Sequence, residues 1–178
     1  MTVAVLSNRP GTGEFDPYYA RYINRVPEGD IASLLEQQIR QTAAALRAVP
    51  GSRATYRYAE GKWSIAEVVG HLTDAERIFA YRALRIARAD ATPMEGFDEN
   101  AYVPAGQFDR RPLAELIDEF EAVRRATVAL VRGLQPEAWT RIGTANGKAI
   151  SVRALVYIAA GHERDHLGTL RERYGVAG

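Results

Sequence analysis

Residues 151–175 read SVRALVYIAAGHERDHLGTLRERYG, a pattern that predicts a long helix with two histidines on its apolar side. Ser151 is a favourable N-cap, and we expect the helix to end near Gly175. The residues that share one face of this helix are Leu155, Ala159, His162, His166 and Leu170. The stripe is therefore apolar at both ends and carries two imidazoles between them.

Three further segments, 30–49, 64–89 and 112–130, show helical periodicity with start signals at their first residues. The second opens with Ser64-Ile-Ala-Glu67, a capping box in which the Ser and Glu side chains satisfy free amides reciprocally. Four helices of this length with apolar stripes predict an all-α protein, a four-helix bundle.

The segments between the helices are expected to be irregular. Residues 91–111 contain two prolines and two glycines and form a linker of about twenty residues, far longer than usual helix connections. Residues 141–150 form a smaller glycine-containing loop, and strand alternation is visible only in the short stretch 53–58. We expect one domain over 1–178, in which 1–21 is an extended or partly ordered N-terminal arm.

Composition restricts the classes of function. The chain has 178 residues and a formal net charge of +1, so no overall field attracts nucleic acid or an anionic membrane. It has no cysteine, which excludes disulfides, thiolate ligands and cysteine nucleophiles. No signal peptide or membrane-spanning run is visible, so we expect a cytoplasmic protein. Arg82, Arg85 and Arg88 cluster on one helix, where a solvated or dimer-facing surface is expected.

The histidines are the strongest functional signal. His162 and His166 lie four residues apart on one helix face, so both imidazoles can reach one ion at about 2.0–2.1 Å. A polar pair on a buried face costs free energy unless a partner satisfies it. A single histidine there is more often a hydrogen-bonded core residue, but the pair together with His71 favours a three-histidine site for one divalent metal ion with an open position.

The depths of the histidines predict the topology. His71 lies about 7 residues, or roughly 10 Å, from the start of its helix, and His166 lies about 8 residues, or roughly 12 Å, from the end of its helix. These depths match only if the two helices are antiparallel. The 91–111 connection allows this by crossing the bundle. We therefore expect an up-down-down-up bundle with a long crossover between helices 2 and 3.

The stretch His162-Glu-Arg-Asp-His166 also fits the H-E-x-x-H signature of zinc peptidases. That chemistry needs a third ligand, usually downstream, and Glu172 is the only carboxylate that follows His166. The longer metzincin pattern fails because Thr169 and Glu172 stand where it requires Gly and His. The sequence therefore disfavours a peptidase.

Two carboxylates are candidate catalytic residues. Glu163 follows His162 directly and could act as a general base toward water at the metal, although a solvated carboxylate is an equally good interpretation. Asp74 lies three residues after His71 on the same side of its helix. Its alternative interpretation is a carboxylate that orients a ligand histidine.

Several motifs together resemble one family. Residues 56–77 read YRYAEGKWSIAEVVGHLTDAER, and residues 79–85, 96–102 and 161–166 read FAYRALR, GFDENAY and GHERDH. This set resembles the DinB-like superfamily over nearly the whole chain. Trp-Ser followed by His-Leu-x-Asp and a late His-x-x-x-His is fairly specific in combination.

The resemblance implies the same up-down-down-up bundle and a divalent ion, nickel or zinc, bound by His71, His162 and His166. It also implies a homodimer. Members of the superfamily include bacillithiol-type S-transferases, a mycothiol-dependent maleylpyruvate isomerase and metal-dependent hydrolases. The resemblance does not imply DNA binding.

Three functions stay open. The first is a thiol-dependent S-transferase or related enzyme, in which the metal binds a low-molecular-weight thiol as its thiolate. The second is a metal-dependent hydrolase with Glu163 or Asp74 as proton acceptor. The third is a non-enzymatic metal-binding stress-response protein. We expect Trp63, Phe97 and Tyr102 to line a small-molecule pocket above the metal, or alternatively to pack in the core and seal it.

Overall fold

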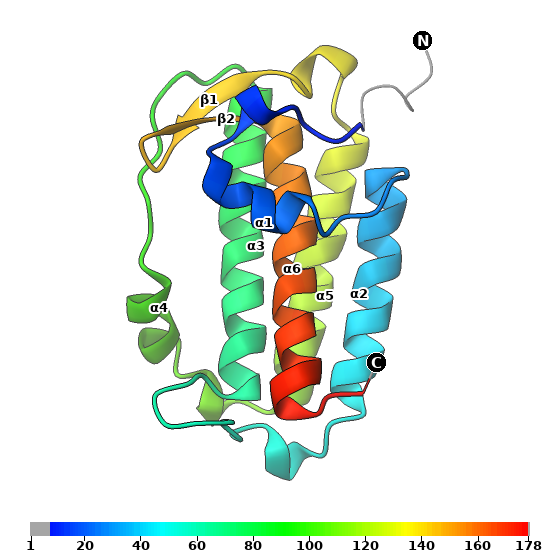
Figure 1. The fold of residues 1–178 in the computed structure, drawn as a ribbon, viewed down its shortest axis with the longest axis vertical. Coiled ribbons are helices and arrows are strands. Elements are labelled where there is room, and N and C mark those ends of the chain that lie inside the picture. The colour runs from blue at the N-terminus through cyan, green and yellow to red at the C-terminus, as the bar shows by residue number, and fades with distance from the viewer. Residues whose placement is uncertain (1–7, 178) are drawn as a thin grey trace.

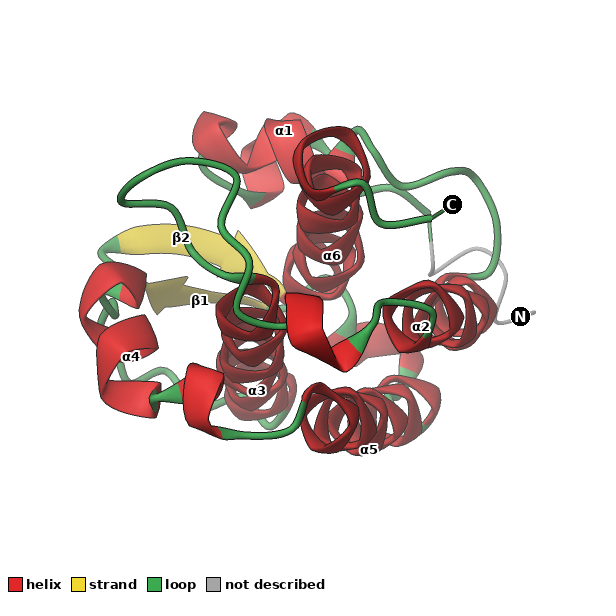
Figure 2. Cartoon of the chain, turned by 90° about the horizontal axis from the view of Figure 1, so that it is seen from below, coloured by secondary structure: helices red, strands yellow, loops and turns green. Residues whose placement is uncertain are grey.

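The computed structural model describes residues 8–177, in which four long helices stand side by side (Figure 1). These helices are α2 (Ile31–Arg47), α3 (Ile65–Ala87), α5 (Leu113–Arg132) and α6 (Val152–Tyr174). Viewed end-on, α3 and α2 occupy opposite corners, and α5 and α6 each lie between them (Figure 2). The predicted four-helix bundle is confirmed.

The directions of the helices also agree with the prediction. In Figure 1, α2 and α6 descend, whereas α3 and α5 ascend. Seen with the molecule turned upside down, this is the predicted up-down-down-up order. The parallel pair α3 and α5 requires the chain to return along the full length of the bundle between them. Because of this crossover, α3 and α6 run antiparallel and bring residues near the start of α3 level with residues near the end of α6.

Side chains fix the helix starts where the sequence placed them. The Asp30 carboxylate accepts a hydrogen bond from the Ser33 amide at 2.9 Å, and the Ser151 hydroxyl accepts one from the Ala154 amide at 3.0 Å. The capping box at the start of α3 is formed in both directions. Gly175 ends α6 in the left-handed conformation at φ 67°, which glycine adopts without a steric penalty.

The apolar stripes of the four helices meet in the bundle interior. Fully buried members include Leu35, Leu46, Ile65, Leu116, Ile117, Phe120, Leu155 and Leu170. Burying one side chain of this size contributes about 1.5–3 kcal/mol. The bundle is therefore held mainly by these stripes. No helix within residues 8–177 combines the length and the apolar character that a membrane span requires.

The crossover is not structureless, which corrects the prediction for residues 91–111. It contains α4 (Glu99–Gly106), whose N-cap Asp98 accepts from the Asn100 amide at 2.9 Å, and a 3-10 helix, Phe108–Arg110. The Phe108 ring packs against Gly70 of α3, where an added Cβ would lie 2.3 Å from it. A local N-cap and this close contact thus stabilise a short helix in spite of Pro104 and Gly106.

A β-hairpin precedes α6, contrary to the loop predicted for residues 141–150. Strands β1 (Ile142–Ala145) and β2 (Lys148–Ser151) are antiparallel and joined by Asn146-Gly147. Both turn residues have positive φ, as the favoured two-residue hairpin turn requires. The expected strand character of residues 53–58 was wrong, since a 3-10 helix ends at Arg53 and turns follow.

The first part of the chain folds over α6 (Figure 1). Of the predicted arm 1–21, residues 1–7 lie outside the described residues. The remainder forms 3-10 helices at Thr12–Glu14 and Pro17–Tyr19 and leads into α1 (Ala20–Ile23). The Glu14 carboxylate accepts from the Ser151 hydroxyl at 2.7 Å and from Arg153 Nε at 2.6 Å, which fastens this segment to the start of α6.

Candidate metal centre

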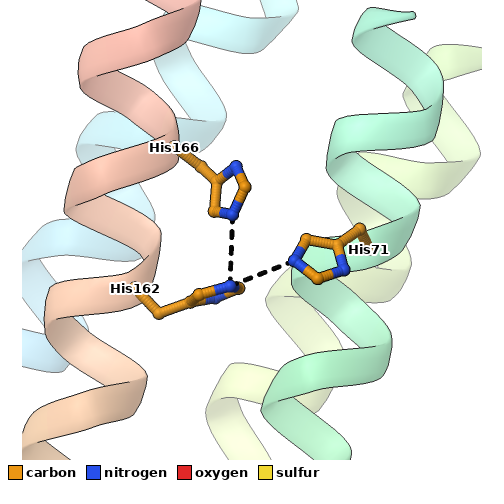
Figure 3. Close-up of side chains that lie close together, drawn as sticks. All are labelled: His71, His162 and His166. Atoms are coloured by element: carbon orange, nitrogen blue, oxygen red, sulfur yellow. Dashed lines mark hydrogen bonds between the residues drawn. The ribbon is translucent and has the colours of Figure 1, made fainter. Parts of the chain in front are cut away.

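Three histidine side chains converge between α3 and α6 (Figure 3). The Nε2 atom of His162 lies 3.0 Å from Nε2 of His71 and 3.1 Å from Nε2 of His166. The available ligand atoms of the three residues all lie within 4.8 Å of one another. The antiparallel arrangement of α3 and α6 therefore brings the histidines to one level, as their depths in the sequence predicted.

The chemistry of these nitrogens fits a bound cation. The single in-plane position of His162 Nε2 either carries a hydrogen or offers a lone pair, so it cannot bond both neighbouring nitrogens as a neutral ring. One ion would satisfy all three nitrogens at once. Two nitrogens held about 2.0–2.1 Å from a tetrahedral ion lie about 3.3 Å apart, close to the observed separations. The site thus fits a divalent metal ion.

Burial keeps the imidazoles neutral. Burial, assisted by the charge of His166, lowers the pKa of His71 to about 3. Burial lowers the pKa of His166 to about 4, against an opposing effect of Asp165 and with a smaller contribution from Arg21. The pKa of His162 is well below its usual value for the same main reason. At neutral pH all three rings are in the unprotonated state that binds metals.

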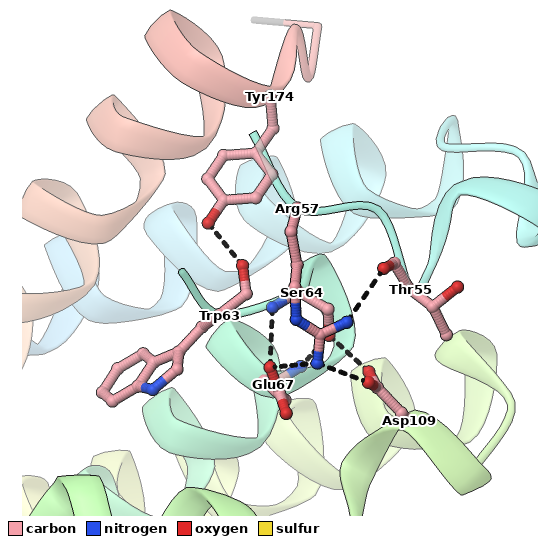
Figure 4. Close-up of polar contacts among 7 residues, drawn as sticks. All are labelled: Thr55, Arg57, Trp63, Ser64, Glu67, Asp109 and Tyr174. Atoms are coloured by element: carbon pink, nitrogen blue, oxygen red, sulfur yellow. Dashed lines mark hydrogen bonds and ion pairs between the residues drawn. The ribbon is translucent and has the colours of Figure 1, made fainter. Parts of the chain in front are cut away.

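Polar contacts hold the turn that precedes α3 and carries Trp63 (Figure 4). The Tyr174 hydroxyl donates to the Trp63 carbonyl at 2.6 Å, and Arg57 bridges Glu67 at 2.9 Å and Asp109 at 2.8 Å. These bonds fix the turn before the helix. In the Trp-Ser motif, the Trp63 indole therefore lies next to the histidines, and the following residue, Ser64, caps α3.

Three aromatic rings pack around the imidazoles. The Trp63 ring centroid lies 4.8 Å from the His71 ring centroid. The Trp63 ring is also stacked on the His166 ring, with the two centroids 6.5 Å apart. Tyr22 and Phe79 approach His162 edge-on, with centroids 5.4 and 5.6 Å away. The rings hold the imidazoles in place and reduce the access of water to them.

A cavity of about 450 Å³ opens beside the histidines. Its wall includes Trp63 and Phe97, two of the three aromatics that the sequence suggested for a pocket. The third, Tyr102, is 47% exposed and contacts the Phe97 ring without lining the cavity. The aromatics thus leave the site open to a small molecule.

The structure does not bring Glu163 to the cavity. Its side chain is buried on another side of α6, where the carboxylate pairs with Arg124 Nη1 at 2.7 Å and accepts from the Gln38 amide. Arg124 also binds both oxygens of Glu76, at 2.7 and 2.9 Å. Glu163 therefore belongs to a buried ion-pair network in the bundle interior.

Asp74 also lies away from the cavity wall. Its carboxylate is 3.6 Å from a guanidinium nitrogen of Arg77, which in turn pairs with Glu119 of α5. Burial raises the pKa of Asp74. Its position places it at the contact between α3 and α5.

Charged residues that the sequence analysis did not assign to the site line the cavity. Asp165 pairs with Arg21 at 2.9 Å and with Arg25 at 2.8 Å, and both arginines come from the N-terminal segment. Arg82 is buried and lines the cavity too, so the solvated or dimer-facing surface expected for it was wrong. Its spacing of 11 residues from His71, about three turns, places both on one face and was a usable signal. No sequence signal linked Arg21 to α6.

Comparisons with known proteins identify the relatives of this arrangement. The family model described as the DinB superfamily matches residues 34–170. No curated protein matches the sequence. Among solved structures, YfiT from Bacillus subtilis, a probable metal-dependent hydrolase with an unusual four-helix bundle topology, aligns with a TM-score of 0.73 and 18% identity over 93% of this chain and 97% of its own.

Two further structures share the fold. The mycothiol-dependent maleylpyruvate isomerase aligns with a TM-score of 0.66 and 14% identity over 81% of this chain, which spans 60% of the isomerase. YjoA, a DinB-like protein from Bacillus subtilis, aligns with a TM-score of 0.58 and 22% identity over 80% of this chain and 87% of its own. At these identities the similarity concerns the fold.

Proposed function

Since the chain belongs to the DinB superfamily, we propose that it is a metal-dependent enzyme for a small-molecule substrate, with His71, His162 and His166 as ligands of one divalent ion, nickel or zinc. The observation that carries the proposal is the convergence of three neutral imidazoles beside an open cavity. Three protein ligands leave coordination positions for a substrate, as in catalytic sites. A sealed metal would instead favour a structural role.

For the reaction, we propose thiol-dependent group transfer. A bound divalent ion would lower the pKa of a coordinating thiol so that the thiolate is present at neutral pH. The thiol proton would pass to water, the sulfur would form a bond to an electrophilic carbon, and the leaving group would depart with the electron pair of the broken bond. No separate general base is then needed, which agrees with the placement of Glu163 and Asp74 away from the cavity.

The protein's own residues would bind the reactants and exclude water. Trp63, Phe79 and Tyr22 surround the imidazoles with apolar rings, and Phe97 extends this surface along the crossover. Such a wall suits the apolar part of a substrate and shields a reactive sulfur from solvent. The fold similarity to a mycothiol-dependent isomerase is in keeping with thiol chemistry.

Hydrolysis is the second candidate, and the position of Asp165 favours it. Asp165 lines the cavity beside the histidines, so it could accept a proton from an attacking water molecule in the role that the sequence suggested for Glu163 or Asp74. The similarity to YfiT, a probable metal-dependent hydrolase, also supports this reaction.

The two reactions are separated by a screen with the zinc- or nickel-loaded protein. Low-molecular-weight thiols are combined with 1-chloro-2,4-dinitrobenzene, and p-nitrophenyl esters are tested without thiol. We expect thiol conjugation that is lost in His166→Ala and retained in Asp165→Asn. Ester hydrolysis that Asp165→Asn abolishes while the metal stays bound would favour the hydrolase. Metal binding without either activity, over a broad set of substrates, would contradict an enzymatic role.

A further inference from the structure

Two arginines are buried in the described part of the chain, and only one of them is paired with a carboxylate. Arg124 in the bundle interior is paired with the carboxylates of Glu76 and Glu163. Arg82 is only 4% exposed, yet it forms no ion pair with any described carboxylate. A buried cation without a counter-charge is costly, and proteins usually pair it. The site therefore leaves a buried positive charge that a ligand could satisfy.

The contacts of Arg82 leave most of its hydrogen-bonding capacity free. One Nη2 hydrogen is donated to the Glu95 carbonyl of the crossover at 2.6 Å, and the guanidinium lies 5.9 Å from the Phe97 ring centroid. These contacts hold the side chain in one orientation against the cavity wall. The remaining N–H groups are donors in the planar fork that binds carboxylates.

The other charges around the cavity do not replace a counter-ion. The carboxylate of Asp165 is paired with Arg21 and Arg25. Glu99 of α4 is exposed at the cavity edge and is not within ion-pair distance of Arg82. Burial lowers the pKa of Arg82, as is expected for a cation that lacks a partner.

The stripe of α3 defines the distance between the two ends of the cavity. His71, Ala75, Phe79 and Arg82 follow one another along the cavity wall. The Cα atoms of His71 and Arg82 are separated by about 16 Å along the helix axis, at 1.5 Å per residue. The α3 residues between them, Ala75 and Phe79, are apolar, whereas polar side chains such as Asn146 and Asp165 line other parts of the cavity. A molecule that contacts both the imidazole cluster and Arg82 must therefore be elongated.

We infer that Arg82 binds a carboxylate of the ligand, so that the site takes an elongated small molecule with a carboxylate at one end, an apolar middle and its reacting group at the histidines. This inference rests on the proposed metal-dependent function and adds the substrate class and a specificity-determining residue to it. The carboxylate belongs either to the thiol or to the molecule that the thiol attacks.

The test compares ligands that differ only in the terminal charge. The zinc-loaded full chain is titrated with 8-mercaptooctanoate and 8-mercaptooctanol by calorimetry. A direct contact with a charged donor predicts at least about tenfold tighter binding of the carboxylate. The short pair 4-mercaptobutanoate and 4-mercaptobutanol cannot reach Arg82 from the histidines, and the carboxylate of this acid closes no small chelate ring on zinc, so no such preference is expected. General attraction of anions would favour the acid in both pairs.

Octanoate and octanol, which have no thiol, show whether the thiol or the electrophile carries the carboxylate. A preference for octanoate as well as for 8-mercaptooctanoate that Arg82→Gln abolishes indicates that Arg82, and not the zinc ion, binds the carboxylate, as a separate electrophilic substrate would require. A preference confined to the mercapto acid places the carboxylate on the thiol. Both results support the role of Arg82.

Variants separate recognition from folding. Arg82→Gln should abolish the carboxylate preference and leave the affinity for 8-mercaptooctanol unchanged, whereas a merely structural role would weaken both. Arg82→Lys keeps the charge and should keep part of the preference, which also covers the case that Arg82→Gln does not fold. Arg85→Gln is the matched control on α3, because Arg85 pairs with Asp90 outside the cavity.

The outcomes distinguish this inference from the proposed function. If wild-type protein binds the long mercapto acid and the long mercapto alcohol equally tightly, the carboxylate role of Arg82 is refuted and the thiol function stands. If it binds neither thiol, the proposed thiol function fails, and equal binding of octanoate and octanol then refutes the carboxylate role of Arg82 as well. A preference that persists in Arg82→Gln would also overturn the assignment.

Discussion

At the scale of single residues, neighbours along a helix can have unrelated roles. His162 points toward the imidazole cluster, whereas Glu163, about 100° further around α6, faces α2 and α5 and pairs with Arg124. The H-E-x-x-H pattern therefore predicted correctly that His162 and His166 lie side by side, but it did not predict that Glu163 is buried in an ion pair. The spacing of Arg82 from His71, about three helical turns, indicates that both side chains lie on the same face of α3, which a surface position for Arg82 does not take into account.

The buried network around Arg124 leads to a stability prediction. Arg124→Leu removes the cation that Glu76 and Glu163 share and leaves two carboxylates in the interior. We expect a loss of about 3–5 kcal/mol in the free energy of unfolding, measured by urea denaturation. Arg125→Leu on the exposed side of the same helix is the control and should change stability little. Equal effects of the two substitutions would argue against the network.

At the scale of elements, the sequence predicts regular helices better than the segments between them. The starts of α2, α3 and α6 follow from capping residues, and the start of α5 follows from Pro112 and periodicity, all of which act locally. The hairpin was missed because its strands have four residues each, too short to show alternation, although Asn146-Gly147 was a direct turn signal. The path of α1 over α6 depends on tertiary contacts, which no local pattern reveals.

The crossing of α1 and α6 depends on a glycine. An added Cβ at Gly161 would lie 2.0 Å from the carbonyl oxygen of Tyr22, whereas one at Gly168 of the same helix would meet nothing within 4 Å. Gly161→Ala should therefore destabilise the protein by about 1–3 kcal/mol through overpacking. Gly168→Ala should stabilise it by about 1 kcal/mol through helix propensity. Thermal unfolding of both variants checks this pair, and stabilisation by both would show that the close approach is not maintained.

At the scale of the whole molecule, function and topology are linked. The histidines come from two helices distant in sequence, and they meet only because the crossover makes α3 and α6 antiparallel. The depths of the histidines in their helices predict this relation from the sequence alone. The shape of the cavity cannot be predicted in this way, because its far wall comes from the N-terminal segment, the crossover and the hairpin.

The buried histidines also make the stability of the metal-free protein depend on pH. The folded-state pKa values of His71 and His166 are about 3 and 4, below the usual 6.5 of an unfolded chain. Below pH 6.5 the unfolded state therefore binds protons that the folded state does not, and the free energy of unfolding falls as pH is lowered. In the presence of a chelator, the urea midpoint should be lower at pH 5 than at pH 7. The double variant His71→Gln, His166→Gln should show a smaller difference, and an unchanged difference would assign the effect to other groups.

The central claim is that three histidines from α3 and α6 bind one metal ion. It is tested most directly by mass-spectrometric measurement of metal per chain in untagged protein purified without chelator, for the wild type and for His166→Ala. We expect close to one transition-metal ion per wild-type chain and loss of that metal in the variant. Absence of stoichiometric metal in the wild type, even after addition of zinc or nickel, would contradict the claim and leave the histidines as packed residues of the bundle.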